Sequence, residues 1–197
     1  MGDLILSSRF NDALVFTAQI HARQRRKGST IPYIAHLLGV TALVLEDGGD
    51  EDQAIAALLH DAVEDLGGLS TLYVIEEKFG ERVAAIVDGC SDTYIDPKPE
   101  WRARKEIYLD RLKTASIDIL RVSLADKLHN AKSILRNLEK EGNSIWGRFN
   151  GAREGTLWYY QSAFEIFQSR IVSQNLDEFS SVLEQIQKIG EEKHHEV

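Results

Sequence analysis

Long stretches of this chain carry apolar residues at intervals of three and four, with no proline to interrupt them. The longest, 116–140, keeps this helical spacing along its whole length. The chain has only three prolines, at 32, 97 and 99, and proline breaks a helix interior because it lacks an amide donor and clashes with the preceding turn. The pattern therefore predicts helices at 8–27, 33–45, 51–65, 70–80, 81–87, 101–114, 116–140, 156–174 and 177–190.

Turn and cap residues separate these segments. Asp50 can cap the helix predicted at 51–65, and Gly67 with Gly68 can end it. No alternating pattern typical of a strand exceeds about four residues, and no linker or internal repeat divides the chain. We expect one compact, all-α, multi-helix domain spanning 1–197, with a charged tail at 191–197 that frays.

Charge and composition exclude several classes of protein. The net charge of −8 argues against non-specific binding to nucleic acid. Cys90 is the only cysteine, so no internal disulfide can form. The densest apolar stretch, 34–45, is too short to span a bilayer, and no secretory signal opens the chain. These features predict a cytoplasmic protein with no membrane partner.

A small set of imidazoles and carboxylates indicates a metal site. His60 and Asp61 are adjacent near a helix end, while His36 and Asp126 each interrupt the apolar pattern of another predicted helix. Each residue alone is typical of a satisfied buried polar group. Together they offer two nitrogen and two oxygen ligands, a set that suits Mn²⁺, Fe²⁺, Zn²⁺ or Mg²⁺. The absence of thiolate ligands argues against a structural zinc site.

Further polar residues follow these ligands at helical spacing. Glu64 and Asp65 lie four residues after His60 and Asp61, where either carboxylate could accept a proton from water. They could instead be ordinary surface acids, although acids are disfavoured at a helix C-terminus. Asn130 lies one turn after Asp126, where it could bind a phosphate or a water molecule.

Two other segments each allow two interpretations. Arg23, Arg25, Arg26 and Lys27 end the first predicted helix, where cations complement the helix dipole but could equally bind an anionic substrate. The aromatic segment 146–160 has the spacing of core residues but could form a second wall of a binding pocket.

Several motifs resemble a known family. Residues 24–27 (QRRK), 32–36 (PYIAH), 59–65 (LHDAVED) and 124–130 (LADKLHN) are similar to the hydrolase domain of the Rel/Spo stringent-response enzymes. These enzymes are HD-domain metal-dependent phosphohydrolases, and the likeness is greatest to their stand-alone form, the small alarmone hydrolases. It covers roughly residues 10 to 170.

The resemblance implies an all-α HD domain that uses Mn²⁺ to remove the 3′-pyrophosphate from guanosine tetra- or pentaphosphate. It implies catalytic acids at Glu64 and Asp65. It implies substrate contacts from Arg26 and Lys27, which would bind guanine and phosphates, and from Asn130. The implied metal ligands are His36, His60, Asp61 and Asp126.

Two departures bear on substrate recognition. Leu66 stands where the family usually has threonine, and Gly28 with Ser29 replaces the usual Ser-Gly order after the basic pair. The same centre could instead serve a nucleotidase, a cyclic-nucleotide phosphodiesterase or an NADPH phosphatase. A module that binds the alarmone without hydrolysing it is a third interpretation, and the sequence leaves the oligomeric state open.

Overall fold

Helices account for the secondary structure, as the sequence predicts. The computed structural model describes residues 6–94 and 97–192, and in these ranges the only β-type pairing is an isolated bridge between Arg25 and Pro32. The all-α class is confirmed. The helices are α1 (Ser8–Ile20), α2 (Ile34–Glu46), α3 (Glu51–Leu59), α4 (Ala62–Leu66), α5 (Leu69–Phe79), α6 (Glu81–Cys90), α7 (Trp101–Leu112), α8 (Ile117–Glu141), the 3₁₀ helix η1 (Gly142–Arg148), α9 (Ala152–Arg170) and α10 (Gln174–Glu192).

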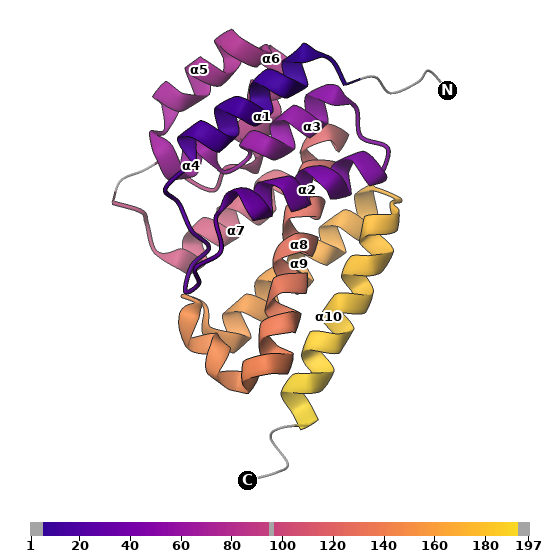
Figure 1. The fold of residues 1–197 in the computed structure, drawn as a ribbon. Helices are drawn as coiled ribbons and strands as arrows, with labels where there is room; N and C mark the ends of the chain where they lie inside the picture. Colours follow the sequence, from indigo (N-terminus) through magenta and orange to yellow (C-terminus); the bar gives the residue numbers. More distant parts are fainter. Residues whose placement is uncertain (1–5, 95–96, 193–197) are drawn as a thin grey trace.

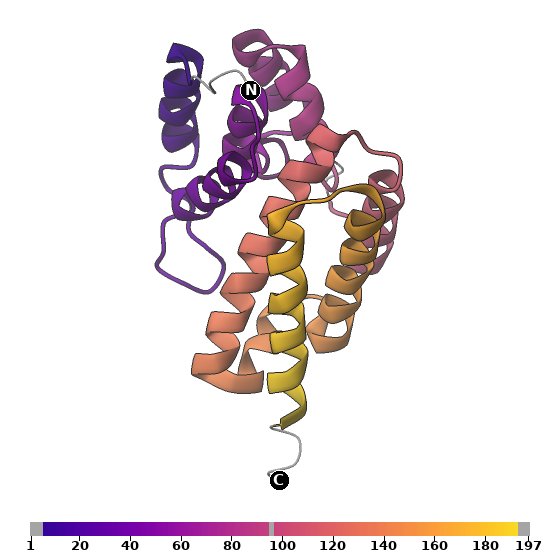
Figure 2. The same cartoon turned by 90° about the vertical axis from the view of Figure 1, so that its right-hand side faces the viewer.

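The long helix α8 runs through the centre of the molecule and joins its two halves. Helices α1 to α6 surround one half, while α9 and α10 lie along the other (Figures 1 and 2). Leu120, Leu124 and Leu138 of α8 are fully buried in one continuous core. Because α2, α3 and α6 all pack against α8, the middle of α8 lies near α2, which carries His36, and near the end of α3, which His60 follows.

The start of α3 follows the cap predicted from the sequence. The Asp50 side chain accepts a hydrogen bond from the Gln53 backbone amide at 3.0 Å, and the Gln53 side chain accepts one from the Asp50 backbone amide. This reciprocal arrangement satisfies amide donors that a helix start leaves free. The predicted stop is also confirmed, because α4 ends at Leu66 and Gly67 adopts a φ of 148° that favours glycine.

The first helix is shorter than predicted, because it stops at Ile20 rather than at residue 27. The His21 ring is buried and stacks on Tyr33, with centroids 5.6 Å apart. The chain then folds back, with the Arg26 amide donating to Ile31 and the Tyr33 amide to Gln24. The basic cluster therefore lies in a loop, and its interpretation as a complement to the helix dipole is wrong.

The C-terminal part also differs from the predicted boundaries. A loop is expected around 141–144, but residues 142–148 form η1, and α9 begins at Ala152 instead of 156. Helix α10 includes residues 191 and 192 of the predicted tail, while 193–197 lie outside the described residues. The single-domain assignment stays a prediction. Among the described helices, none has the length and apolar character needed to cross a bilayer.

Candidate metal centre

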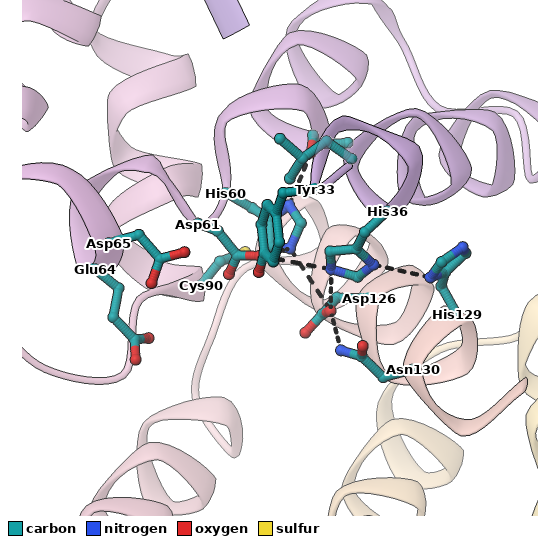
Figure 3. A network of polar contacts seen from close by, with 12 residues as sticks. Tyr33, His36, His60, Asp61, Glu64, Asp65, Cys90, Asp126, His129 and Asn130 are labelled. Carbon is teal, nitrogen blue, oxygen red and sulfur yellow. Dashed lines mark hydrogen bonds and ion pairs between the residues drawn. The ribbon is translucent and has the colours of Figure 1, made fainter. Parts of the chain in front are cut away.

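The four predicted ligands come together beside α8 (Figure 3). His36 belongs to α2, His60 and Asp61 join α3 to α4, and Asp126 belongs to α8. The Asp126 Oδ1 atom lies 3.2 Å from His36 Nε2 and 3.6 Å from His60 Nε2. The Asp61 Oδ2 atom lies 3.5 Å and 3.1 Å from the same two nitrogens. Two imidazoles and two carboxylates thus surround one small volume.

The adjacent His60 and Asp61 side chains converge at a break between two helices. A single helix is predicted over 51–65, but α3 ends at Leu59 and α4 starts at Ala62. The Asp65 amide bonds back to the Asp61 carbonyl, which begins the second helix. Neighbouring residues within one helix point about 100° apart. His60 and Asp61 keep near-helical backbone dihedrals at the junction, yet His60 Nε2 and Asp61 Oδ2 lie 3.1 Å apart, so the pair reaches one point from the end of α3.

Hydrogen bonds orient each imidazole with Nε2 toward the cluster. His60 Nδ1 donates to the Ala57 carbonyl at 2.8 Å, and His36 Nδ1 lies 2.8 Å from His129 Nδ1. The His60 Nε2 atom is buried and has no hydrogen-bond partner. An unpartnered buried nitrogen is costly unless a ligand satisfies it. A divalent cation bound between His60 Nε2 and the two carboxylates would satisfy this nitrogen, and it would replace the proton that the carboxylates otherwise favour there.

Charge pairing sets the protonation of the cluster. Burial by itself lowers the pKa of His60, but the Asp61 and Asp126 carboxylates outweigh it and raise this pKa well above its usual value. Burial opposes ionisation of Asp126, yet Lys127 and the two imidazoles hold its pKa well below the usual range. The carboxylates therefore stay ionised and offer anionic oxygens to a cation.

Two neighbours on α8 hold the Asp126 carboxylate. Lys127 Nζ donates to Oδ2 at 2.6 Å, and Asn130 Nδ2 donates to Oδ1 at 2.6 Å. Asn130 also accepts a hydrogen bond from Arg26 Nη2 at 2.6 Å. The structure therefore places Asn130 between Arg26 and Asp126, whereas Lys27 is exposed.

The two predicted catalytic acids have different surroundings. Glu64 accepts a hydrogen bond from Lys98 Nζ at 2.8 Å and lines the cavity beside the cluster. Asp65 is not among the described cavity residues, and Gln24 Nε2 donates to its Oδ2 at 2.6 Å. Burial of the carboxylate and the nearby Asp61 charge raise the pKa of Asp65. Glu64 is thus the acid that faces the cavity.

A cavity of about 260 Å³ adjoins the metal centre. Asp61, Glu64, Asp126 and Asn130 form its polar side, and Arg26 and Lys27 are not among its described lining residues. Another wall of the cavity is aromatic and includes part of the segment that the sequence leaves undecided. This wall consists of Trp101, Tyr108, Phe149, Tyr159 and Tyr160. Because Tyr159 and Tyr160 are also buried, they serve the core and the cavity at once.

Several residues of the site carry no signal in the sequence strong enough to assign them. Tyr33 donates to Asp61 Oδ2 at 2.6 Å, and only its place beside His36 in the motif points to the site. Lys105 also lines the cavity, and its Nζ donates to the buried Asp92 carboxylate at 2.8 Å. Lys105 lies on α7, far along the chain from the ligands, so only packing brings it to the cavity.

Comparisons with known proteins agree with this geometry. The HD domain family profile matches residues 13–157, about three quarters of the chain. A Xenopus tropicalis protein named guanosine-3′,5′-bis(diphosphate) 3′-pyrophosphohydrolase MESH1 is 40% identical over 128 residues, which cover 64% of this chain and 69% of that protein. A Synechocystis protein named as a probable enzyme of the same activity is 36% identical over 125 residues, 62% of this chain but only 16% of that protein.

Solved structures show the same fold. One, described as a metazoan ortholog of SpoT that hydrolyzes ppGpp and plays a role in starvation responses, has a TM-score of 0.75 and 27% identity. That likeness covers 93% of this chain and 98% of the other. A Listeria monocytogenes protein has a TM-score of 0.68 and 28% identity over 78% of this chain and 99% of its own. The chain therefore belongs to the HD domain family, among the relatives of MESH1 and of the SpoT hydrolase domain.

Proposed function

We propose that this chain removes the 3′-pyrophosphate from guanosine tetra- and pentaphosphate, giving GDP or GTP and pyrophosphate, with Mn²⁺ as its metal. The observation that carries the proposal is the convergence of two imidazoles and two carboxylates beside a cavity with a polar and an aromatic wall. The names of the frog and metazoan relatives supply the substrate. A metal-dependent phosphohydrolase of nucleotides needs both features.

The ligand set fits the metal, and His36, His60, Asp61 and Asp126 would hold it. When bound, a divalent cation polarises phosphoryl oxygens and makes nearby water a stronger acid. A mixed set of imidazole and carboxylate ligands suits a divalent transition metal, and Mn²⁺ is the one that the family resemblance implies. The remaining chemistry belongs to the side chains of the cavity.

We assign Glu64 the task of taking the proton of the attacking water, because its side chain lines the cavity beside the metal ligands. In the reaction, the water oxygen bonds to the phosphorus carried by the 3′ oxygen, and the bond from that phosphorus to the 3′ oxygen breaks. The water proton passes to the Glu64 carboxylate, and the 3′ oxygen takes an equivalent proton from solvent, to which Glu64 then releases its own. Lys98, which donates to Glu64 Oε1, keeps the carboxylate oriented.

Replacing Glu64 by glutamine tests this role. We expect the turnover number to fall by about a hundredfold or more, because a positioned general base contributes at least that much. Mn²⁺ affinity, measured by calorimetry, should stay within about twofold of the parent value. Glu77→Gln, an exposed change on α5, is the matched control. A Glu64→Gln enzyme with parental turnover would contradict the assignment.

The hydrogen bond between Gln24 and Asp65 leads us to expect that a Gln24 variant changes the pH dependence of turnover. The Gln24 amide stabilises the ionised form of Asp65 and so lowers its pKa, against the burial and Asp61 charge that raise it. Removing the amide in Gln24→Met should raise the Asp65 pKa further. The limb of the pH–rate profile that Asp65 governs should therefore move to higher pH. Asp65→Asn should abolish this limb, and an identical profile for Gln24→Met and parent would contradict the prediction.

Substrate binding is proposed for three residues that the resemblance implies. Arg26 lies 5.7 Å from the Tyr33 ring and bonds Asn130, which lines the cavity. We assign Asn130 to the substrate phosphates or the attacking water. We assign Arg26 and the exposed Lys27 to the base and phosphates at the rim. The cytoplasmic location and the absence of nucleic-acid and membrane partners stay predictions.

The decisive experiment gives the purified, Mn²⁺-loaded protein guanosine tetraphosphate and separates the products by chromatography. GDP and pyrophosphate in equal amounts support the proposal. Parallel reactions with nucleoside monophosphates, cyclic nucleotides and NADPH test the alternative activities of the same centre. If one of these compounds is turned over faster, that compound and not the alarmone is the substrate. Tight binding of guanosine tetraphosphate without products would indicate a binding module. Parallel loading with Fe²⁺, Zn²⁺ and Mg²⁺ tests the choice of metal.

A further inference from the structure

The two imidazoles of the metal centre are supported in different ways. His60 Nδ1 donates to a backbone carbonyl, that of Ala57. His36 Nδ1 instead lies 2.8 Å from the Nδ1 atom of another imidazole, that of His129 on α8. The two ring centroids are 4.8 Å apart, and Figure 3 shows His129 on the side of His36 away from the carboxylates.

The direction of this hydrogen bond follows from the task of His36. A histidine that offers Nε2 to a metal must carry its proton on Nδ1, and that proton needs an acceptor. A neutral imidazole with its own proton on Nε2 has a free lone pair on Nδ1. His129 in this tautomer accepts the His36 proton. The pair thereby fixes both the tautomer and the rotation of the His36 ring.

Helix α2 is shaped to admit the His129 ring. Gly39 lies one turn after His36, and a Cβ atom at this position would lie 2.4 Å from His129 Nε2 and 2.5 Å from Cδ2. No real structure tolerates such contacts, so any larger residue would displace the ring. Glycine weakens a helix interior relative to alanine, and the close approach of His129 explains why α2 carries one here.

We propose that His129 is a positioning residue of the metal centre, which holds His36 in the tautomer and orientation that ligates the cation, in a space that Gly39 leaves open. This inference rests on the metal centre of the proposed function but not on the identity of the substrate. Outer-shell partners of ligating histidines typically change metal affinity by about 10- to 100-fold.

Four variants separate positioning from a purely structural role. Asparagine places an amide oxygen near the position of histidine Nδ1, and glutamine places one near Nε2. His129→Asn therefore keeps a hydrogen-bond acceptor for His36 Nδ1. His129→Gln carries an acceptor in the wrong place, and His129→Phe keeps a ring of similar shape but has no acceptor. Gly39→Ala leaves His129 chemically intact but pushes its ring away.

The readout is the Mn²⁺ dissociation constant, measured by calorimetry and by electron paramagnetic resonance of free Mn²⁺. We expect it to rise about 10- to 100-fold in His129→Phe and His129→Gln, and to stay within about threefold of the parent in His129→Asn. Gly39→Ala should weaken binding as well. In the double variant Gly39→Ala/His129→Phe the two effects should not add, because both act through one contact.

Other results would overturn the inference. One such result is a His129→Phe protein that is folded, as circular dichroism shows, and that binds Mn²⁺ with parental affinity. Should that variant fail to fold, equal affinities of the asparagine and glutamine variants would have the same meaning. A parent protein that binds no Mn²⁺ would overturn the metal centre itself, whereas a parent that binds Mn²⁺ but leaves guanosine tetraphosphate intact would overturn only the proposed substrate.

Discussion

Replacing Asp126 by alanine or asparagine is expected to abolish Mn²⁺ binding and to lower turnover about a thousandfold or more. Asp126 Oδ1, like Asp61 Oδ2, lies close to both imidazoles. Together with His36 and His60, Asp126 also forms a set of ligand atoms within 4.8 Å of one another. A bound cation contributes several kcal/mol of charge stabilisation in the transition state, and each 1.4 kcal/mol is worth a factor of ten in rate.

The asparagine variant keeps the shape of the side chain, so its fold can be checked separately by thermal unfolding in EDTA. Asp118→Asn, on the first turn of the same helix, is the matched control and should keep parental metal affinity. Metal content is measured by mass spectrometry after dialysis, and turnover by release of pyrophosphate. A folded Asp126→Asn protein that hydrolyses guanosine tetraphosphate at the parental rate would disprove the metal assignment.

The second large effect is expected for Lys127→Met, and it concerns stability. Lys127 is buried, donates to Asp126 Oδ2 at 2.6 Å and lies 5.0 Å from the centre of the Tyr108 ring. Burial alone would lower the pKa of Lys127, but Asp126 outweighs it and raises this pKa well above the usual value. Methionine fills the space but leaves the buried carboxylate without its cation. Breaking a buried ion pair in this way costs about 3–5 kcal/mol of unfolding free energy.

Urea unfolding in EDTA measures this loss. Lys113→Met provides the control, because Lys113 and Asp110 form an exposed pair, and such pairs contribute about 0–1 kcal/mol. Added Mn²⁺ should restore part of the stability of Lys127→Met, since a ligand that binds only the folded state stabilises it by mass action. Equal unfolding free energies for the two variants would show that Lys127 does not compensate the Asp126 charge.

The residues of the metal centre could be predicted because their signal is local. His60 with Asp61 follows an apolar run, and His36 and Asp126 interrupt two others, so each departs from a pattern that a few neighbouring residues define. The structure brings all four together, and their role as ligands stays a prediction. The break after Leu59, where the adjacent pair lies, has no such signal because helical spacing continues through it.

The sequence by itself determined the all-α class, the cap of α3 at Asp50, the course of α8 and the residue types of a metal site. These depend on periodicity and on hydrogen bonds between residues three or four positions apart. Only the tertiary structure decided the fold-back of residues 21–33, the aromatic wall of the cavity and the contact between His36 and His129. His36 and His129 are 93 positions apart, and their contact depends on how α2 packs against α8. The free energy of that packing comes from burial of apolar faces, which fixes which helices meet but not which polar side chains they bring together.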